Sequence, residues 1–303
     1  MRSRRRRPLV GIGQECSPVG DNISVAVPLS AIAFRTDDVR KLHPSMYVES
    51  SGPGGGPVGC VWTGCPGWSP RSLLLIPDGC VDIVWDGKSI TVVPPRAAAV
   101  RHALTDQELT VGVRFRPGWA AHTLRTTIAS LPAVTDMADV RRAREVSRFA
   151  EVLADERDPM DAARLLAHWI EELRPAGSLA DARLLQAIDL LSQPRASVAS
   201  AASQAGYSVR ELRRRFAQHV GLSPKSFQRV ARFQRFRSLI AGPVPPLTMA
   251  QAAALCGYSD QAHLAHDCRL LTHRTPTAFA RAAVAGHQPP IPGPVPRGLM
   301  QRN

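Results

Sequence analysis

Two short stretches near the C-terminus carry side chains that could bind phosphate groups and base edges. In the first, Val209, Leu212 and Phe216 recur at helical spacing and leave an arginine-rich face opposite them. Guanidinium groups on such a face can donate paired hydrogen bonds to phosphate oxygens or to guanine. The candidate binding residues of the two stretches are Ser208, Arg210, Arg213, Arg214, Gln261, His263, His266 and Arg269.

Both stretches belong to a local pattern that occurs twice. Each copy has a helix of small apolar residues, a Gly-Tyr-Ser corner at Gly206 or Gly257, a second helix and a Ser-Pro or Thr-Pro pair. Glycine enters the left-handed conformation without a Cβ penalty, which lets two helices meet at a sharp angle. Ser208 is placed to cap its helix, and Thr248 precedes Gln251 at capping-box spacing. The pattern predicts two helix-turn-helix units.

On these motifs, the segment from about Leu179 to Ala283 resembles the DNA-binding domain of the AraC/XylS family of bacterial transcription regulators. In that family a long helix bridges two helix-turn-helix units, and here Ser226 to Phe236 provides the bridge. The resemblance implies sequence-specific binding to double-stranded DNA across two successive major grooves. The second unit departs from the family pattern at Ala265-His266, Cys268 and His273. Since Cys268 replaces a large core aromatic, we predict that this unit opens first.

The distribution of charge agrees with this interpretation. From residue 178 onward the chain has 16 Lys and Arg against 5 Asp and Glu, whereas residues 8–177 have 17 against 20. A basic module joined to a slightly acidic one is typical of a DNA-binding domain attached to a sensing domain. The arginine run from Met1 to Arg7 is expected to be solvated, although it could also serve as an arm that binds DNA phosphates.

The N-terminal half has the alternation of a sheet. Cys80–Trp85 and Ser89–Val93 flank Asp86-Gly87, which predicts a hairpin with a type I′ turn. Arg71–Ile76 and Leu109–Phe115 are further predicted strands. The string from Ile76 to Trp85, with Gly112 to Gly118, is similar to the N-terminal domain of a subgroup of AraC-like regulators, which implies a small, partly open β-barrel. Helices are predicted over Ala120–Ile128 and within Asp136–Leu173.

Four charged residues within these strands are candidates for the lining of an effector pocket, namely Asp78, Asp82, Arg114 and Arg116. Charged groups embedded in strands need partners, and a ligand could provide them. The alternative is structural, with Asp78 capping the Pro-Asp-Gly turn and Asp82 pairing with Arg114 across strands.

Cysteine chemistry is the main competing interpretation. Cys60, Cys65 and Cys80 are clustered, but they lack the paired spacing and the fourth ligand of a zinc site. A redox, metal or alkylation sensor therefore remains an alternative, as does an architectural, non-specific DNA binder. The sequence shows no phosphate loop, nucleophile elbow, HExxH motif or pair of catalytic carboxylates, so we expect no enzyme, catalytic residue, metal or cofactor.

The predicted fold is a multidomain α+β protein, with a small β-barrel-like domain, a helical connector and an all-α domain of two helix-turn-helix units. Besides DNA, we consider a small-molecule effector, RNA polymerase and a second copy of the chain as partners. No apolar run reaches the length of a membrane span, so a cytoplasmic, nucleoid-associated protein is expected. The predicted segments are a disordered arginine-rich tail (1–25), a sensing domain (26–135), a connector (136–177), the DNA-binding domain (178–285) and a disordered proline-rich tail (286–303).

Overall fold

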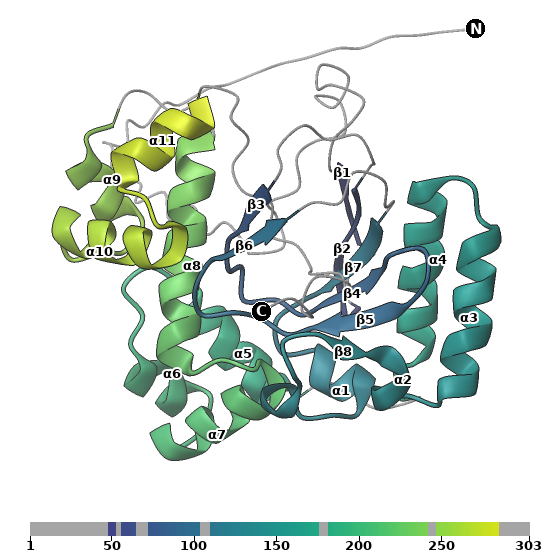
Figure 1. Cartoon of the computed structure of the whole chain (residues 1–303). Helices are drawn as coiled ribbons and strands as arrows, with labels where there is room; N and C mark the ends of the chain where they lie inside the picture. Colours follow the sequence, from purple (N-terminus) through teal and green to yellow (C-terminus); the bar gives the residue numbers. More distant parts are fainter. Residues whose placement is uncertain are drawn as a thin grey trace, which may run out of the picture.

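The computed structural model describes residues 48–52, 56–64, 72–103, 110–175, 181–241 and 247–284. Both predicted tails and Cys65 lie outside these residues. Figure 1 shows a β-sheet with helices α3 and α4 on one side and helices α5 to α11 on the other. Within the described ranges, no helix combines the length and the apolar character needed to cross a membrane.

The N-terminal part is built on a six-stranded antiparallel sheet in the order β1-β2-β7-β4-β5-β8. The sheet is open, with β1 and β8 at its edges, where the resemblance implies a small, partly open barrel. A separate two-stranded sheet pairs β3 with β6. The strands are β1 (Val48–Ser51), β2 (Val58–Gly64), β3 (Ser72–Leu75), β4 (Asp82–Trp85), β5 (Ile90–Val93), β6 (Val100–Ala103), β7 (Thr110–Phe115) and β8 (Thr135–Asp136).

The hairpin between β4 and β5 is present, but its turn differs from the prediction. Trp85 pairs with Ile90, so the loop has four residues rather than two. Gly87 has a positive φ of 88°, whereas Asp86 is not among the positive-φ residues that a type I′ turn needs. The Asp86 carboxylate instead accepts hydrogen bonds from the backbone N–H groups of Lys88 and Ser89 at 3.0 and 2.9 Å. This local side-chain bonding selects the longer loop.

Helices pack on the sheet and share its core. Leu153 from α3, Leu166 and Ile170 from α4, and Ile83 and Val113 from the sheet lie in one buried cluster. The apolar stripe predicted within Asp136–Leu173 is therefore largely intramolecular core. The elements are α1 (Ala120–Leu124), the 3₁₀ turn η3 (Ile128–Ser130), α2 (Met137–Val140), α3 (Ala143–Asp155) and α4 (Pro159–Glu172).

The C-terminal part is entirely helical. Helix α8 is the predicted bridge, and it carries the buried stripe of Phe227, Val230, Phe233 and Phe236. Helices α6 and α7 lie on one side of this bridge in the chain, and α9 and α10 lie on the other. The elements are α5 (Ala182–Leu191), α6 (Val198–Gln204), α7 (Val209–His219), α8 (Pro224–Ala241), α9 (Met249–Leu255), α10 (Gln261–Thr272) and α11 (Pro276–Val284).

Candidate nucleic-acid interface

Both predicted corners are formed by glycines in the left-handed conformation. The φ angle is 69° at Gly206 and 84° at Gly257. After each corner a tyrosine N–H closes the preceding helix, from Tyr207 to the Ala202 carbonyl and from Tyr258 to the Ala253 carbonyl. The chain therefore leaves α6 and α9 at a sharp angle and enters α7 and α10, which are the recognition helices of the two units.

Helix α7 presents the arginines of the first unit to solvent. Its N-cap is Ser208, whose hydroxyl accepts a hydrogen bond from the Glu211 N–H at 3.1 Å, as the capping pattern predicts. Arg210, Arg213 and Arg214 are exposed, while the apolar residues on the other face are buried. Three guanidinium groups on one exposed helix face are suited to phosphate oxygens and guanine edges.

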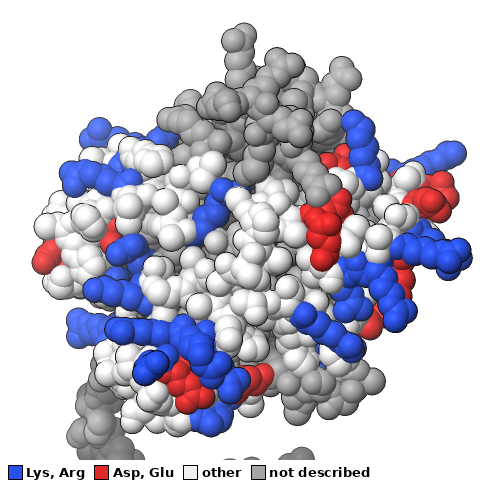
Figure 2. Space-filling model, turned by 60° about the horizontal axis from the view of Figure 1, so that its bottom comes forward, with Lys and Arg blue, Asp and Glu red and all other residues white. Residues whose placement is uncertain are grey.

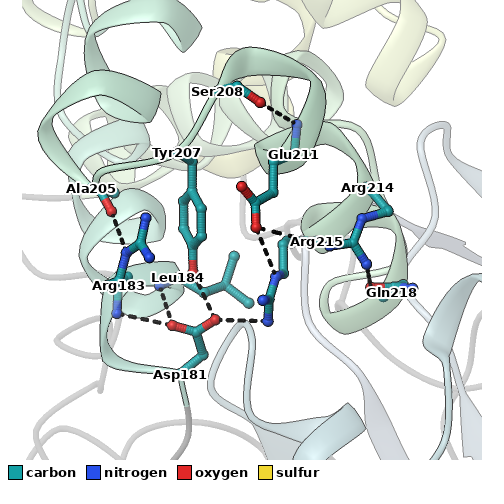
Figure 3. A network of polar contacts seen from close by, with 10 residues as sticks. All are labelled: Asp181, Arg183, Leu184, Ala205, Tyr207, Ser208, Glu211, Arg214, Arg215 and Gln218. Atoms are coloured by element: carbon teal, nitrogen blue, oxygen red, sulfur yellow. Dashed lines mark hydrogen bonds and ion pairs between the residues drawn. The ribbon is translucent and has the colours of Figure 1, made fainter.

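A polar network attaches α7 and the corner before it to the N-terminus of α5 (Figure 3). The Asp181 carboxylate accepts a hydrogen bond from the Tyr207 hydroxyl at 2.6 Å and pairs with Arg215 at 3.0 Å. It also caps α5 by accepting from the N–H groups of Arg183 and Leu184. Burial alone would raise the pKa of Asp181, but these hydrogen bonds and the Arg215 charge lower it below its ordinary value.

Arginine and tyrosine also stack within this network. The Arg183 guanidinium lies 4.2 Å from the centre of the Tyr207 ring, and its Nε donates to the Ala205 carbonyl at 2.8 Å. Burial and the hydrogen bond to Asp181 raise the pKa of Tyr207 to about 12. Sequence analysis did not identify these roles of Asp181, Arg183 and Arg215. The position of Asp181 immediately before α5 was the one available signal.

Helix α10 exposes fewer arginines than α7 does. Its N-cap is Asp260 rather than the Ser259 of the Gly-Tyr-Ser corner, and the Asp260 carboxylate accepts from the His263 N–H at 2.7 Å. Gln261, His266 and Arg269 are exposed as expected. His263 is half-buried, because its ring packs edge-on against Tyr258 and its Nδ1 lies 3.1 Å from the Ser259 hydroxyl. His263 therefore already has partners inside the unit.

A buried acid at the centre of α10 holds two arginines of the bridge. Asp267 is 2% exposed, and its oxygens lie 3.2 Å from Arg229 Nε and 3.4 Å from Arg232 Nη2. The Arg232 guanidinium also lies 5.3 Å from the centre of the Tyr258 ring. The cluster leaves no local pattern in the sequence, since its residues come from helices that are separated in the chain.

Basic side chains gather on the side of the C-terminal helices. Figure 2 shows Lys and Arg over much of the left side of the molecule, where α5 to α11 lie in Figure 1. On the right side, over α3 and α4, basic and acidic residues alternate. Acidic residues also lie among the Lys and Arg on the left side, but with 16 Lys and Arg against 5 Asp and Glu from residue 178 onward the net charge of this part is positive and attracts a polyanion.

The structure brings three of the four suspected pocket residues together in the N-terminal part, where they pair with one another. Arg114 Nε lies 2.9 Å from Asp78 and 3.2 Å from Asp82, and Arg114 Nη1 lies 2.8 Å from Glu49, which sequence analysis missed. Asp78 also caps its turn by accepting from the Cys80 N–H at 3.0 Å. Both structural roles considered for Asp78 and Asp82 are therefore present. Arg116 lies beside Gly59 of the neighbouring strand.

Asp82 is the most buried acid of this cluster. It faces Arg114 in the strand register and accepts a hydrogen bond from Trp62 Nε1 at 3.1 Å. Burial raises the pKa of Asp82 to about 7, although Arg114 opposes the shift, and the charge of Asp78 adds to it. Burial therefore favours the protonated form of Asp82 over a wider pH range than in an exposed aspartate.

The two described cysteines near this cluster have weakly reactive thiols. Burial raises the pKa of Cys60 to about 12 and raises the pKa of Cys80 well above its usual value. Sensing cysteines need the thiolate form, which a lowered pKa supplies. The chemistry of these two thiols does not favour the cysteine-sensor alternative.

Both parts of the chain match family models. Residues 201–282 match a family model described as a helix-turn-helix domain. Residues 57–134 match a model described as a domain of unknown function (DUF6597). Among curated proteins, none matches the chain significantly.

Two similar solved structures are both bacterial. An AraC-type transcriptional regulator from Chromobacterium violaceum is 23% identical, with 34% of this chain and 94% of that chain covered and a TM-score of 0.31. ToxT from Vibrio cholerae is 10% identical, with 78% and 98% covered and a TM-score of 0.39. TM-scores this low support no argument about function, so DNA binding is supported by the match of residues 201–282 to the helix-turn-helix model.

Proposed function

We propose that this chain, a DNA-binding transcription regulator with an AraC-type helix-turn-helix domain, reads two successive major grooves through α7 and α10. The observation that carries the proposal is the exposed row of Arg210, Arg213 and Arg214 on a capped helix that the Asp181 network attaches to its unit. Arg210 and Arg213 reach base edges, while Ser208 and Arg214 bind phosphates. In the second unit Gln261, His266 and Arg269 make the corresponding contacts. His263 stabilises the start of α10 through its contacts with Tyr258 and Ser259.

The experiment that tests this proposal selects DNA sites from random duplexes with the full-length protein and then measures affinity against salt. With 16 basic residues from residue 178 onward, we expect six or more phosphate contacts, which gives a log–log slope of about −5 or steeper. A slope near zero would exclude DNA as the partner. Selection of no common sequence would instead favour the architectural, non-specific binder.

Met1 to Arg7 lies outside the described residues, and its contribution is measured separately. Deleting this run should change the slope by less than about one if its arginines are merely solvated. A larger loss would assign phosphate contacts to the run.

The N-terminal part supplies the regulatory input in this proposal. A small-molecule effector, acting at Asp78, Asp82, Arg114 and Arg116, would have to replace the pairs that Arg114 already makes with Asp78, Asp82 and Glu49. RNA polymerase and a second copy of the chain are the further proposed partners, since regulators gain operator affinity by binding as dimers. Sedimentation of the protein with and without its selected DNA site tests the dimer.

A further inference from the structure

One residue of the N-terminal part lies in the core of the second helix-turn-helix unit. Ile76, immediately after β3, is 2% exposed and belongs to the same buried cluster as Phe233, Phe236, Leu264 and Cys268. The other buried members of that cluster, among the described residues, come from helices α8, α9, α10 and α11 and the corner between α9 and α10. In the first unit the buried cluster around Phe216 contains residues of the C-terminal part alone, although η3 and α1 of the N-terminal part contact α7 outside that cluster.

The residues that follow Ile76 contact the bridge helix α8 at further points. Gln234 Nε2 donates a buried hydrogen bond to the Pro77 carbonyl at 2.6 Å. Gly79 has a φ of 81°, and a Cβ at this position would lie 3.2 Å from the Phe227 ring. The backbone of the loop therefore lies directly against α8, and a side chain at Gly79 would be strained and crowded.

The same loop is part of the Arg114 cluster. Asp78 accepts from the Cys80 N–H with one carboxylate oxygen and pairs with Arg114 through the other. Within residues 76–80, Ile76 thus makes an apolar contact with the second unit, and Asp78 makes an ionic contact with Arg114 of the sheet. We expect the position of Ile76 to depend on the apolar contact with the second unit and on the ion pair between Asp78 and Arg114.

The core of the second unit has a smaller side chain than the core of the first unit at one matching position. Cys268 follows the N-cap of α10 by as many residues as Phe216 follows the N-cap of α7, so a small side chain stands where the first unit has an aromatic ring. A smaller side chain at a buried position leaves less apolar surface for the unit to bury by itself. Ile76 contributes apolar surface to that core from outside the unit.

We infer that the loop Ile76–Cys80 completes the core of the second helix-turn-helix unit, and that the Arg114 cluster positions this loop. The N-terminal part is then a positioning element for α9 to α11. The inference rests on the proposed function only for its consequence in DNA binding. Exchange of backbone amides in α9 to α11 tests it without DNA.

The decisive variant is Ile76→Ala in the full-length protein. We expect amides of α9 to α11 to exchange about tenfold faster or more, while amides of α6 and α7 keep their rates. Affinity for the selected DNA site should fall as well, because one recognition helix is less well ordered. If the wild-type protein bound no DNA, the proposed function would fail while the exchange result still stood.

Leu153→Ala is the matched control, since Leu153 is fully buried in the N-terminal core and belongs to a different cluster from Ile76. Equal acceleration of α9 to α11 exchange in this control would overturn the inference, as would equal acceleration of both units in Ile76→Ala. Ile76→Val removes a single methyl group and should give a smaller change in the same helices, which keeps the test available if Ile76→Ala does not fold.

The second step of the inference is tested with Asp78→Asn. An Asn side chain retains an oxygen for the Cys80 N–H but loses the charge that pairs with Arg114. We expect faster exchange in α9 to α11, by a smaller factor than in Ile76→Ala. Unchanged exchange in those helices would refute the role of the Arg114 cluster.

Discussion

The two helix-turn-helix units hold their recognition helices with ion pairs of opposite polarity. Counted from the N-caps Ser208 and Asp260, Arg215 and Asp267 occupy the same helix position. In the first unit the recognition helix provides the cation, Arg215, and Asp181 provides the anion. In the second unit the recognition helix provides the anion, Asp267, and α8 provides Arg229 and Arg232.

Because the ion pairs are reversed, the two units use their arginines differently. The first unit needs one arginine of α7 for its internal pair and leaves Arg210, Arg213 and Arg214 exposed. The second unit uses two arginines of the bridge to balance Asp267, which is 2% exposed, whereas the Asp181 side chain is 22% exposed. We therefore expect the first unit to contribute more to DNA binding and the second unit to depend more on its internal ion pair.

The largest expected effect comes from removing the charge of Asp267, the more buried of the two acids. Asp267→Asn should destabilise the protein by about 3–5 kcal/mol, because it leaves two arginines beside a buried site without their anion. Asp181→Asn, the matched change in the first unit, should cost about 1 kcal/mol or less, since solvent screens that pair. Denaturant unfolding of both variants measures the difference, and equal losses would contradict the comparison.

The next effect separates the units in DNA binding. Arg210→Ala should weaken binding to the selected site by about 1–3 kcal/mol and relax preference at one or two base pairs. Gln261→Ala in the second unit should cost less, because it removes no charge. Titrations with selected and random duplexes provide the measurement. Equal weakening on both duplexes would make Arg210 a phosphate contact only.

A smaller effect concerns the ends of the recognition helices. Gly221 and His273 stand at the same distance from their N-caps, and both have positive φ, 81° and 57°. Gly221→Ala should cost about 1–2 kcal/mol for the left-handed conformation, and its Cβ would also lie 2.6 Å from the Ile128 side chain. His273→Gly should change stability by less than about 1 kcal/mol. Thermal unfolding of the two variants compares them.

A further effect is a pH dependence in the first unit. Folding lowers the pKa of Asp181, so its carboxylate stabilises the protein above the unfolded pKa, and this contribution is lost as the pH falls through the folded value. The Tm difference between wild type and Asp181→Asn should therefore shrink on acidification below about pH 5. A difference that stays constant down to pH 3 would refute the role of the charge.

Asp82 in the N-terminal part should show the opposite trend. Its pKa is raised from 3.8 to about 7, so ionisation opposes folding as the pH rises through that window. Asp82→Asn should therefore gain stability relative to wild type from about pH 4 to about pH 7. Melting curves across that range measure it, and a relative loss of stability with rising pH would contradict the assignment.

Features that depend on neighbouring residues were predictable from the sequence. The corners at Gly206 and Gly257, the cap at Ser208 and the capping box at Thr248 form as expected, because each rests on bonds within a few residues. The turn at Asp86-Gly87 was mistaken, since the Asp86 side chain competes for the backbone N–H groups that define the loop.

By itself, the amino-acid sequence determined the two helix-turn-helix units, the bridge and the basic surface, because helical periodicity, glycine corners and net charge are properties of short segments. Only the tertiary structure decided which charges pair and what completes each core. Asp267 meets Arg229 and Arg232 because α8 and α10 pack together, and Ile76 enters the second unit because the loop after β3 lies on α8. Contacts between segments far apart in the chain leave no local pattern, so they arise only when packing brings their side chains together.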